Sequence, residues 1–238
     1  MPKAAEAPSS TLGLRRIRLL EGLAPDALQA LAQQCAWRRY RPDQRVISRQ
    51  AADQDVYLIV SGSVRVTAYS GSGKQVTFRD IAAGETFGEL AALDGRPRSA
   101  DVVALEETLV ASLNPAAFRA LLHDHPAVCD RMLARLTTSV RELTERVFDL
   151  STLGVQNRVH AELLRLAQLA GIDRNVARID PAPKHSDIAS HVSTYREQVT
   201  REISALVKRG LVQRSGGALV IPDVARLARM VAEVRRSA

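Results

Sequence analysis

Apolar residues recur at alternating steps of four and three through a stretch that begins at Pro126. The series is Cys129, Leu133, Leu136, Val140, Leu143, Val147 and Leu150. This is the heptad pattern of a coiled coil, in which β-branched residues at a and leucine at d favour two parallel strands. The pattern predicts a central helix over residues 126–154. It also predicts a homodimer interface along Leu133, Leu136, Val140, Leu143, Val147 and Leu150. A helix packed on its own domain is the alternative, although it usually carries a wider apolar stripe.

The region before this helix has the spacing of a β-rich domain. Glycines recur every 11 residues at positions 62, 73, 84 and 95, and strand-like stretches such as residues 64–69 and 75–78 lie between them. Short strands with evenly spaced turns are typical of a sandwich or roll. The segment 70–73 is a candidate hairpin tip, and Pro25 is expected to open a helix that runs to Cys35. We expect a flexible tail over residues 1–18 and a β-roll domain over residues 19–125.

The positive charge of the chain is concentrated at its C-terminal end. Of a net charge of +7 over 238 residues, +6 falls on residues 156–238, which hold 14 Lys/Arg and 8 Asp/Glu. Such asymmetry indicates nucleic acid or an anionic membrane surface as the partner of this part, although a solvated face gives the same count. No apolar run reaches the ~18 residues that cross a bilayer, so we expect a cytoplasmic protein. Two distant cysteines, Cys35 and Cys129, favour neither a disulfide framework nor an iron–sulfur site.

The run from Phe87 to Ala100 has the residues of an anion seat. Gly88 at a turn that opens a short helix lets a ligand approach main-chain N–H groups. Arg98 brings a permanently charged planar fork to the same anion. An ionised Glu89 accepts hydrogen bonds and cannot donate them, so it suits a hydroxyl donor such as a ribose 2′-OH. The alternative is a turn without a ligand, in which Glu89 and Arg98 pair with each other.

This run resembles the phosphate-binding cassette of cyclic-nucleotide-binding domains. By that resemblance Gly88, Glu89 and Leu90 frame the phosphate and ribose, Arg98 neutralises the phosphate, and Ser99 adds a hydroxyl contact. One departure is the segment 49–53, which has alanine where relatives usually carry a Gly-Asp turn. We expect that departure to alter the loop without touching the cassette.

The resemblance also extends to the central helix, which closes over the base in this family. It makes Thr144 a candidate base contact, with a surface position beside the seam as an equally weighted alternative. Leu143 stands where the family's cyclic AMP receptor protein has a hydroxyl that reads the amino group of adenine. The resemblance makes cyclic AMP the first expected ligand, and this departure at Leu143 keeps cyclic GMP as the alternative.

The C-terminal third has the pattern of a helix-turn-helix. Residues 184–192 indicate a short helix, and Thr194 is expected to start a second one with Glu197 in a capping box. Val199, Ile203, Leu206 and Val207 supply its predicted buried stripe. The segments 211–214 and 218–221 around a Ser-Gly-Gly turn predict a β-hairpin wing. This winged helix-turn-helix domain is expected to span residues 155–238.

The second helix carries side chains that read bases. Arg196 and Arg201 can bond both acceptors of guanine, and Glu197 can accept from cytosine. Tyr195, Gln198 and Thr200 are further candidate contacts to bases or phosphates. Thr194, at the expected start of the helix, is also a candidate DNA-binding residue. The spacing of Arg196, Glu197 and Arg201 resembles that of the recognition helix of the cyclic AMP receptor protein, which implies TGTGA-like half-sites. An i, i+4 pair of Glu197 and Arg201 on a solvated helix is the alternative.

Taken over residues 19–224, the chain is identified as a member of the cyclic AMP receptor protein and fumarate-nitrate regulator superfamily. The resemblance implies an α+β chain with a β-roll, a dimerisation helix and a DNA-binding domain. It implies double-stranded DNA and a cyclic mononucleotide as partners, RNA polymerase as a further candidate, and no cofactor beyond the allosteric ligand. The alternatives are a ligand-independent or cyclic di-GMP-responsive regulator and an enzyme. The sequence favours neither catalysis nor a metal site, because no nucleophile or metal motif accompanies its five histidines.

Overall fold

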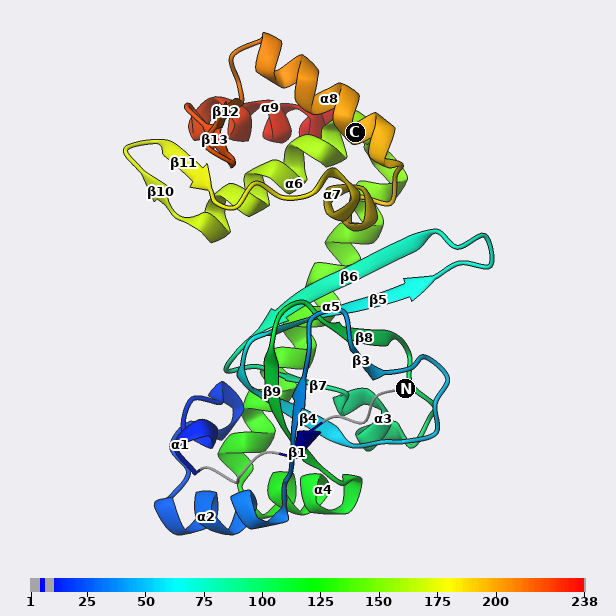
Figure 1. The fold of residues 1–238 in the computed structure, drawn as a ribbon, viewed down its shortest axis with the longest axis vertical. Coiled ribbons are helices and arrows are strands. Elements are labelled where there is room, and N and C mark those ends of the chain that lie inside the picture. The colour runs from blue at the N-terminus through cyan, green and yellow to red at the C-terminus, as the bar shows by residue number, and fades with distance from the viewer. Residues whose placement is uncertain (1–4, 7–10, 238) are drawn as a thin grey trace. The chain divides into compact units, whose positions relative to one another are not determined.

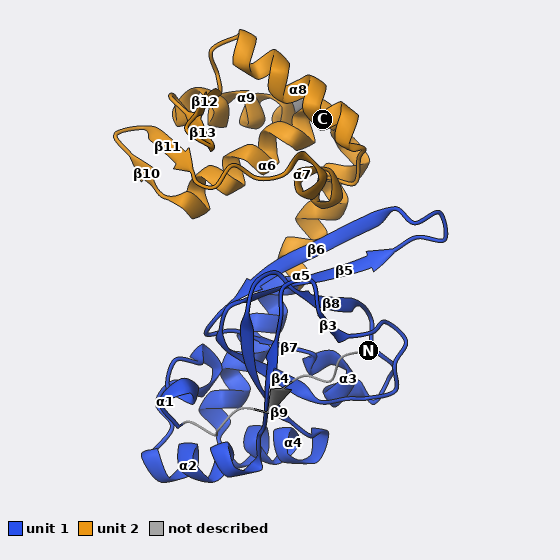
Figure 2. Ribbon diagram, in the orientation of Figure 1, with its two compact units in different colours: residues 1–139 blue, residues 140–238 orange. Residues whose placement is uncertain are grey.

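The computed structural model describes residues 5–6 and 11–237 and divides the chain into two compact units (Figures 1 and 2). The first unit covers residues 1–139 and the second covers residues 140–238. The division falls inside helix α5 (Pro126–Thr152), the long helix that the heptad pattern predicts. The mixed fold with a β-rich N-terminal domain, a long helix and a C-terminal helix-turn-helix confirms the predicted α+β class.

The first unit is built on two antiparallel sheets. One sheet has the order β1 (Ala5–Glu6), β2 (Ala36–Tyr40), β9 (Thr108–Leu113), β4 (Val56–Ser61), β7 (Thr86–Phe87). The other has the order β3 (Arg45–Ile47), β8 (Asp101–Ala104), β5 (Ser63–Tyr69), β6 (Gln75–Ala82). Inward side chains of both sheets, such as Ile59 and Val64, share one apolar cluster, which is the core of the predicted roll.

A second apolar cluster fills the space between the five-stranded sheet and the helices. The helical elements of this unit are α1 (Thr11–Leu14), η1 (Arg18–Leu20), α2 (Pro25–Gln34), α3 (Glu89–Asp94), α4 (Pro115–Asp124) and the first part of α5. Helix α2 begins at Pro25, as predicted, because proline has no N–H to lose at a first helical position. Val128 and Met132 of α5 are buried in this cluster, so the start of the long helix is part of the first unit's core.

The glycines spaced by 11 residues mark turns, as the sequence predicts. All four adopt positive φ angles, from 73° at Gly95 to 91° at Gly84. At Gly62 a Cβ atom would lie 2.5 Å from the carbonyl oxygen of Glu107, so the turn into β5 admits only glycine. The tip at residues 70–73 joins β5 to β6, which pair from Ser63 with Ala82 to Tyr69 with Gln75.

The heptad residues of α5 are largely open to solvent in the single chain. The exposed fraction is 62% for both Val140 and Val147, and Leu133, Leu143 and Leu150 are exposed as well. Leu136 differs, because it is half-buried against the helical core of the first unit. The seam is therefore an apolar face over most of its length.

The second unit combines helices with a small four-stranded sheet. Its elements are the rest of α5, α6 (Val155–Ala170), β10 (Ile172–Asp173), β11 (Val176–Ile179), α7 (His185–His191), α8 (Arg196–Lys208), β12 (Gln213–Ser215), β13 (Ala218–Ile221) and α9 (Val224–Ser237). The wing of β12 and β13 forms as predicted, and β11 adds to its other edge. The sequence reading missed β10 and β11, because two- and four-residue strands give little periodic signal.

The core of this unit confirms most of the predicted stripe of α8. Val199, Ile203 and Leu206 are fully buried, but Val207 is 37% exposed, so its predicted burial is wrong. The first three follow the i, i+4, i+7 spacing of one face, and Val207 lies 100° beyond Leu206 at the edge of that face. Among residues 5–6 and 11–237, no helix combines the length and apolar character that spanning a membrane requires.

Candidate functional site

The turn between β7 and α3 has a backbone conformation that only glycine accepts. Gly88 has a φ of 85° and is the N-cap of α3. A Cβ atom there would lie 2.8 Å from Nη1 of Arg98 and 2.9 Å from the carbonyl oxygen of Asp55. Because both neighbours are fixed by hydrogen bonds, a larger residue would displace the arginine from this turn.

Arg98 is the central cation of the turn, with a side chain only 3% exposed. Its Nε and Nη2 donate to Oδ2 of Asp53 at 3.1 and 2.6 Å, its Nη1 donates to the carbonyl oxygen of Gly88 at 3.0 Å, and its Nη2 also donates to the carbonyl oxygen of Asp55 at 2.8 Å. The guanidinium lies 5.7 Å from the centre of the Tyr57 ring, which stacks on Phe87. These contacts hold the fork in one orientation.

The loop over residues 49–53 contacts this arginine directly, which the sequence alone did not indicate. Gln50 has a φ of 67° and its N–H donates to the carbonyl oxygen of Arg98 at 2.9 Å. The N–H of Arg98 donates in turn to the carbonyl oxygen of Ala51. Asp53 then supplies the carboxylate that binds the guanidinium. The sequence could not place these contacts, because 45 residues separate Asp53 from Arg98.

Glu89, the first residue of α3, is a buried carboxylate with an unused acceptor. The residue is 5% exposed, and its Oε1 lies 3.6 Å from Nη2 of Arg79. Its Oε2 has no hydrogen-bond partner among the described residues. The expected alternative, a direct pair between Glu89 and Arg98, does not form, because Arg98 bonds Asp53 instead. A buried carboxylate oxygen without a donor is costly, so this oxygen is suited to a donor supplied by a ligand or water.

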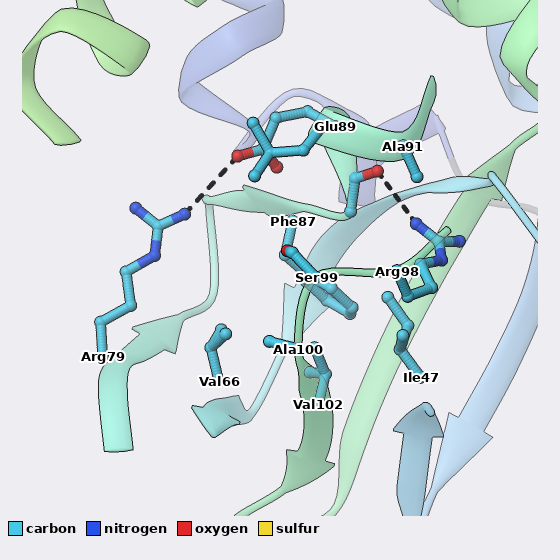
Figure 3. Close-up of a pocket in the computed structure, with 12 residues that line it drawn as sticks. Ile47, Val66, Arg79, Phe87, Glu89, Ala91, Arg98, Ser99, Ala100 and Val102 are labelled. Atoms are coloured by element: carbon cyan, nitrogen blue, oxygen red, sulfur yellow. Dashed lines mark hydrogen bonds and ion pairs between the residues drawn. The ribbon is translucent and has the colours of Figure 1, made fainter. Parts of the chain in front are cut away.

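These residues line one cavity of about 70 Å³ in the first unit (Figure 3). Arg98 lies on one side of the view and Arg79 on the other, the Glu89 carboxylate points toward Arg79, and apolar side chains such as Phe87 and Val102 lie between the two arginines. The structure thus brings together the five predicted cassette residues: Gly88, Glu89, Leu90, Arg98 and Ser99. Their contacts to a ligand stay a prediction.

Arg79 of β6 is a lining residue that the sequence reading missed. It points into the cavity and its Nη1 donates to Oγ of Ser139 at 3.1 Å. A signal was available: Ile81, two residues further along the strand, is buried, so Arg79 shares the inward face of β6. A charged residue on the inward face of a strand indicates a polar partner or a ligand.

Thr144, the predicted base contact, lies on the part of α5 that belongs to the second unit. The side chain is exposed, and its hydroxyl donates to the carbonyl oxygen of Val140 at 2.9 Å. This bond to the preceding turn is common for threonine in helices. Its role toward a base stays a prediction.

Helices α7 and α8 form the helix-turn-helix of the second unit. The turn passes through Ser193 with a φ of 55°, and the N–H of Thr194 donates to the carbonyl oxygen of Ala189 at 2.9 Å. The predicted capping box is wrong: α8 begins at Arg196 with Tyr195 as N-cap and no side-chain cap. The hydroxyl of Thr194 instead donates to the side chain of Gln198, because the helix starts too late for Thr194 to cap it.

Most of the predicted DNA contacts are exposed side chains at the start of α8, but Thr194, which precedes the helix, is only 6% exposed. Tyr195 is 63% exposed, and Arg196, Glu197, Thr200 and Arg201 are also exposed, whereas Gln198 is half-buried. On the opposite face, Glu202 accepts a 2.6 Å hydrogen bond from Nε2 of His160 on α6, and both residues are buried. The buried face therefore holds α8 in place while the other face stays open.

His185, at the start of α7, contacts the same helix. Its Nδ1 lies 2.7 Å from the hydroxyl of Thr200. Partial burial, and then the nearby charges of Arg214 and Arg196, lower the pKa of His185. The side chain is therefore mainly neutral near pH 7.

Two family models match the two units. The cyclic nucleotide-binding domain matches residues 37–125, and the Crp-like helix-turn-helix domain matches residues 157–230. Together they cover the roll with its cavity and the domain that contains α7 and α8.

Known proteins resemble the chain over most of its length. It is 32% identical to the cyclic AMP receptor protein of Thermus thermophilus, over 88% of this chain and 94% of that protein. It is 27% identical to the CRP-like cAMP-activated global transcriptional regulator of Mycobacterium tuberculosis, over 91% of this chain and 97% of that protein. The structure of the c-di-GMP-responsive regulator CLP of Xanthomonas campestris shares the fold. The TM-score is 0.73 and the sequence identity 18%, over 84% of this chain and 99% of that chain.

The fold and these matches define a transcription regulator with a cyclic-nucleotide-binding domain and a DNA-binding helix-turn-helix. The chain belongs to the CRP/FNR family.

Proposed function

We propose that this chain is a homodimeric regulator that binds cyclic AMP, or else cyclic GMP, in the cavity of the roll and palindromic DNA through α8. The observation that carries the proposal is the unused oxygen of Glu89, buried in a cavity that Arg98 and Arg79 also line. A cyclic nucleotide offers what this cavity needs, because its ribose has a free 2′-OH to donate and its phosphate has one negative charge.

The order of the lining residues fits the order of groups in such a ligand. The phosphate would lie at the Gly88 turn near Arg98 and Ser99, the ribose at Glu89, and the base toward Arg79. Four of the five N–H donors of a guanidinium are used by the Asp53, Asp55 and Gly88 contacts of Arg98, which leaves one on Nη1 for a phosphate oxygen. The cavity of about 70 Å³ is smaller than sites for small molecules usually are, so a bound nucleotide would widen it or extend into the open solvent at its mouth.

The base and the class of nucleotide are proposed from the relatives and from Leu143. The relatives from Thermus thermophilus and Mycobacterium tuberculosis are named for cyclic AMP, which favours that nucleotide. Leu143 lacks the hydroxyl that would read adenine, so cyclic GMP is the second candidate, with Thr144 as the proposed base contact. A ligand-independent or cyclic di-GMP-responsive regulator remains the alternative, since one structural neighbour responds to c-di-GMP. Arg98, at a single turn, favours one phosphate over two.

The dimer and its DNA contacts follow from two exposed faces. Val140 and Val147 are each 62% exposed, and pairing two copies of α5 would remove them from water. Two copies of α8 about one DNA turn apart (~34 Å) would then reach successive major grooves of a palindromic site. Arg196, Glu197 and Arg201 are the proposed base-reading residues. RNA polymerase is a further proposed partner of the DNA-bound dimer.

Calorimetric titration of the full chain with cyclic AMP, cyclic GMP and cyclic di-GMP tests the nucleotide proposal. One of the two mononucleotides is expected to bind, with one molecule per chain. If none of the three binds, the chain is a ligand-independent regulator and the proposal fails. Tighter binding of cyclic di-GMP than of either mononucleotide would establish the alternative.

The position of the phosphate is tested by the variant Ser99→Ala. Loss of a hydroxyl that bonds a charged phosphate should cost about 1.5 kcal/mol, or roughly tenfold in affinity. Ser72→Ala, at the exposed tip between β5 and β6, is the matched control and should bind as the wild type does. Equal affinities for the two variants would contradict the placement of the phosphate at this turn.

A further inference from the structure

We infer that the groove between the wing and α8 is a site for one DNA backbone phosphate, and that His185 contacts this phosphate only in its protonated form. DNA binding by this chain then takes up a proton at each site and strengthens as the pH falls. The inference rests on the proposed function, because it requires α8 to be the helix that meets DNA.

The groove is a cavity of about 370 Å³ in the second unit. Its lining residues come from the wing, from α8 and from the segment that leads into α7, and they include Pro183, His185, Ile203, Arg214, Gly217 and Leu219. Two hydrogen bonds hold the tip of the wing in place. The N–H of Ala182 donates to the carbonyl oxygen of Gly217 at 2.8 Å, and Nη2 of Arg178 donates to that of Ser215 at 3.3 Å. The groove is therefore a fixed hollow beside the proposed base-reading helix.

The charges that act on His185 from the wing and from α8 are positive. Partial burial is the main cause that lowers the pKa of its ring, and Arg214 of the wing and Arg196 of α8 lower it further. Arg196 and Thr200 share one face of α8, whereas Glu197 and Arg201 lie about 100° further around that helix. An anion in the groove would be attracted by both arginines.

The segment that leads into α7 adds one more cation. Lys184 is exposed and directly precedes His185, and Asp187 lies two residues after it on the same helix. Asp180, the carboxylate before this segment, is paired with Arg178 at 3.2 Å. The groove therefore has the charge of a phosphate site, since phosphate contacts to DNA come mainly from basic and polar side chains.

Two linked hydrogen bonds fix which nitrogen of His185 carries a proton. Nδ1 lies 2.7 Å from the hydroxyl oxygen of Thr200, and that hydroxyl donates to the carbonyl oxygen of Arg196 at 2.9 Å. The single hydroxyl hydrogen is used in the second bond, so Thr200 accepts from Nδ1, which must hold the proton. In the neutral ring Nε2 is then an acceptor only, and it cannot donate to a phosphate oxygen.

Protonation changes what the ring offers to the groove. A proton on Nε2 makes this nitrogen a donor and gives the ring a positive charge, which allows a charge-assisted hydrogen bond to a phosphate oxygen. The phosphate also offsets the repulsion from Arg214 and Arg196, so bound DNA raises the pKa of His185 above its value in the free chain. Because the bound state holds the proton more tightly, DNA affinity increases as the pH falls through this interval.

The pH dependence of DNA binding tests the inference. Fluorescence anisotropy of the full chain would give the dissociation constant at about pH 6 and about pH 8, on either side of the ordinary pKa of histidine. Ionic strength would be held fixed, and saturating cyclic AMP or cyclic GMP would be present or absent. One duplex would carry two TGTGA half-sites and the other none. Since a backbone phosphate carries no sequence information, both duplexes should show the response.

Three variants separate the charge of His185 from other effects of pH. His185→Gln removes the titrating ring, whereas His185→Arg supplies a permanent positive charge. His123→Gln is the matched control, because His123 is an exposed histidine on α4 of the first unit.

The wild type and His123→Gln should bind both duplexes at least about threefold more tightly at the lower pH, as part of the roughly tenfold that a charged hydrogen bond contributes. His185→Gln should bind about equally at the two pH values. At the higher pH, His185→Arg should bind roughly tenfold more tightly than His185→Gln.

A His185→Gln protein with the full wild-type response would overturn the inference alone. So would a His185→Arg protein that binds no more tightly than His185→Gln at the higher pH. Equal affinity of the wild type for the two duplexes would instead contradict the proposed half-site recognition, and the pH response on either duplex would still decide the role of His185.

Discussion

Arg98 stabilises the first unit even before a ligand arrives, and this has a measurable consequence. Its guanidinium ties the loop at Asp53, the start of β4 at Asp55 and the turn at Gly88 into one cluster. The variant Arg98→Ala should therefore lose stability as well as nucleotide affinity. A surface arginine that bound only the ligand would affect affinity alone.

The size of the effect follows from the partners left behind. Removing one member of a buried ion pair costs about 3–5 kcal/mol. Asp53 is 48% exposed and can turn to water, so the lower end, about 3 kcal/mol, applies here. For a unit of this size, a loss of about 3 kcal/mol corresponds to roughly 10 °C in the unfolding midpoint.

Thermal unfolding of the full chain, followed by circular dichroism without nucleotide, measures this change. Arg96→Ala is the matched control, because Arg96 is exposed and only two residues away, and surface substitutions usually stay within about 0.5 kcal/mol. Arg98→Ala should melt about 10 °C below Arg96→Ala. A difference of less than about 2 °C would refute the structural role of the guanidinium.

Three further predictions test other parts of the molecule. Val140→Glu places a charge in the exposed seam and should convert the proposed dimer to single chains in sedimentation equilibrium; an unchanged mass would remove α5 as the interface. Gly88→Ala forces a Cβ into the turn at a φ of 85° and should lower nucleotide affinity at least about tenfold by calorimetry, whereas wild-type affinity would show that the turn tolerates side chains. Burial and Arg214 lower the folded-state pKa of His185, so the unfolded chain takes up the proton first. This residue should therefore reduce stability as pH falls below about 6.5, and His185→Gln should flatten that dependence; equal slopes for both proteins would contradict it.

The sequence was most informative where a local pattern repeats or where a short motif is dense. The steps of four and three predicted α5 to within two residues of its end, because a 27-residue helix with an apolar face has a strong period. The glycine spacing predicted the turns of the roll for the same reason. The segment from Gly88 to Ser99 could be read as a ligand seat because its residues are close in sequence and fold around one cavity.

The contacts that the sequence could not supply link residues that are far apart along the chain. Asp53 reaches Arg98 across 45 residues, and Arg79 reaches Ser139 across 60. The predicted start of α8 was also wrong. Thr194 and Glu197 have the spacing of a capping box, but the turn at Ser193 makes the helix begin at Arg196. Register and turn conformation decide such cases, and neither is a property of one segment alone.

The central claim is that a nucleotide held at Gly88 and Arg98 changes how the chain binds DNA. Fluorescence anisotropy of a labelled palindromic duplex with two TGTGA half-sites, titrated with the full chain, tests it most directly. Saturating cyclic AMP or cyclic GMP should tighten binding at least about fivefold over the nucleotide-free protein. Identical DNA affinity with and without a nucleotide that calorimetry shows to be bound would contradict the account.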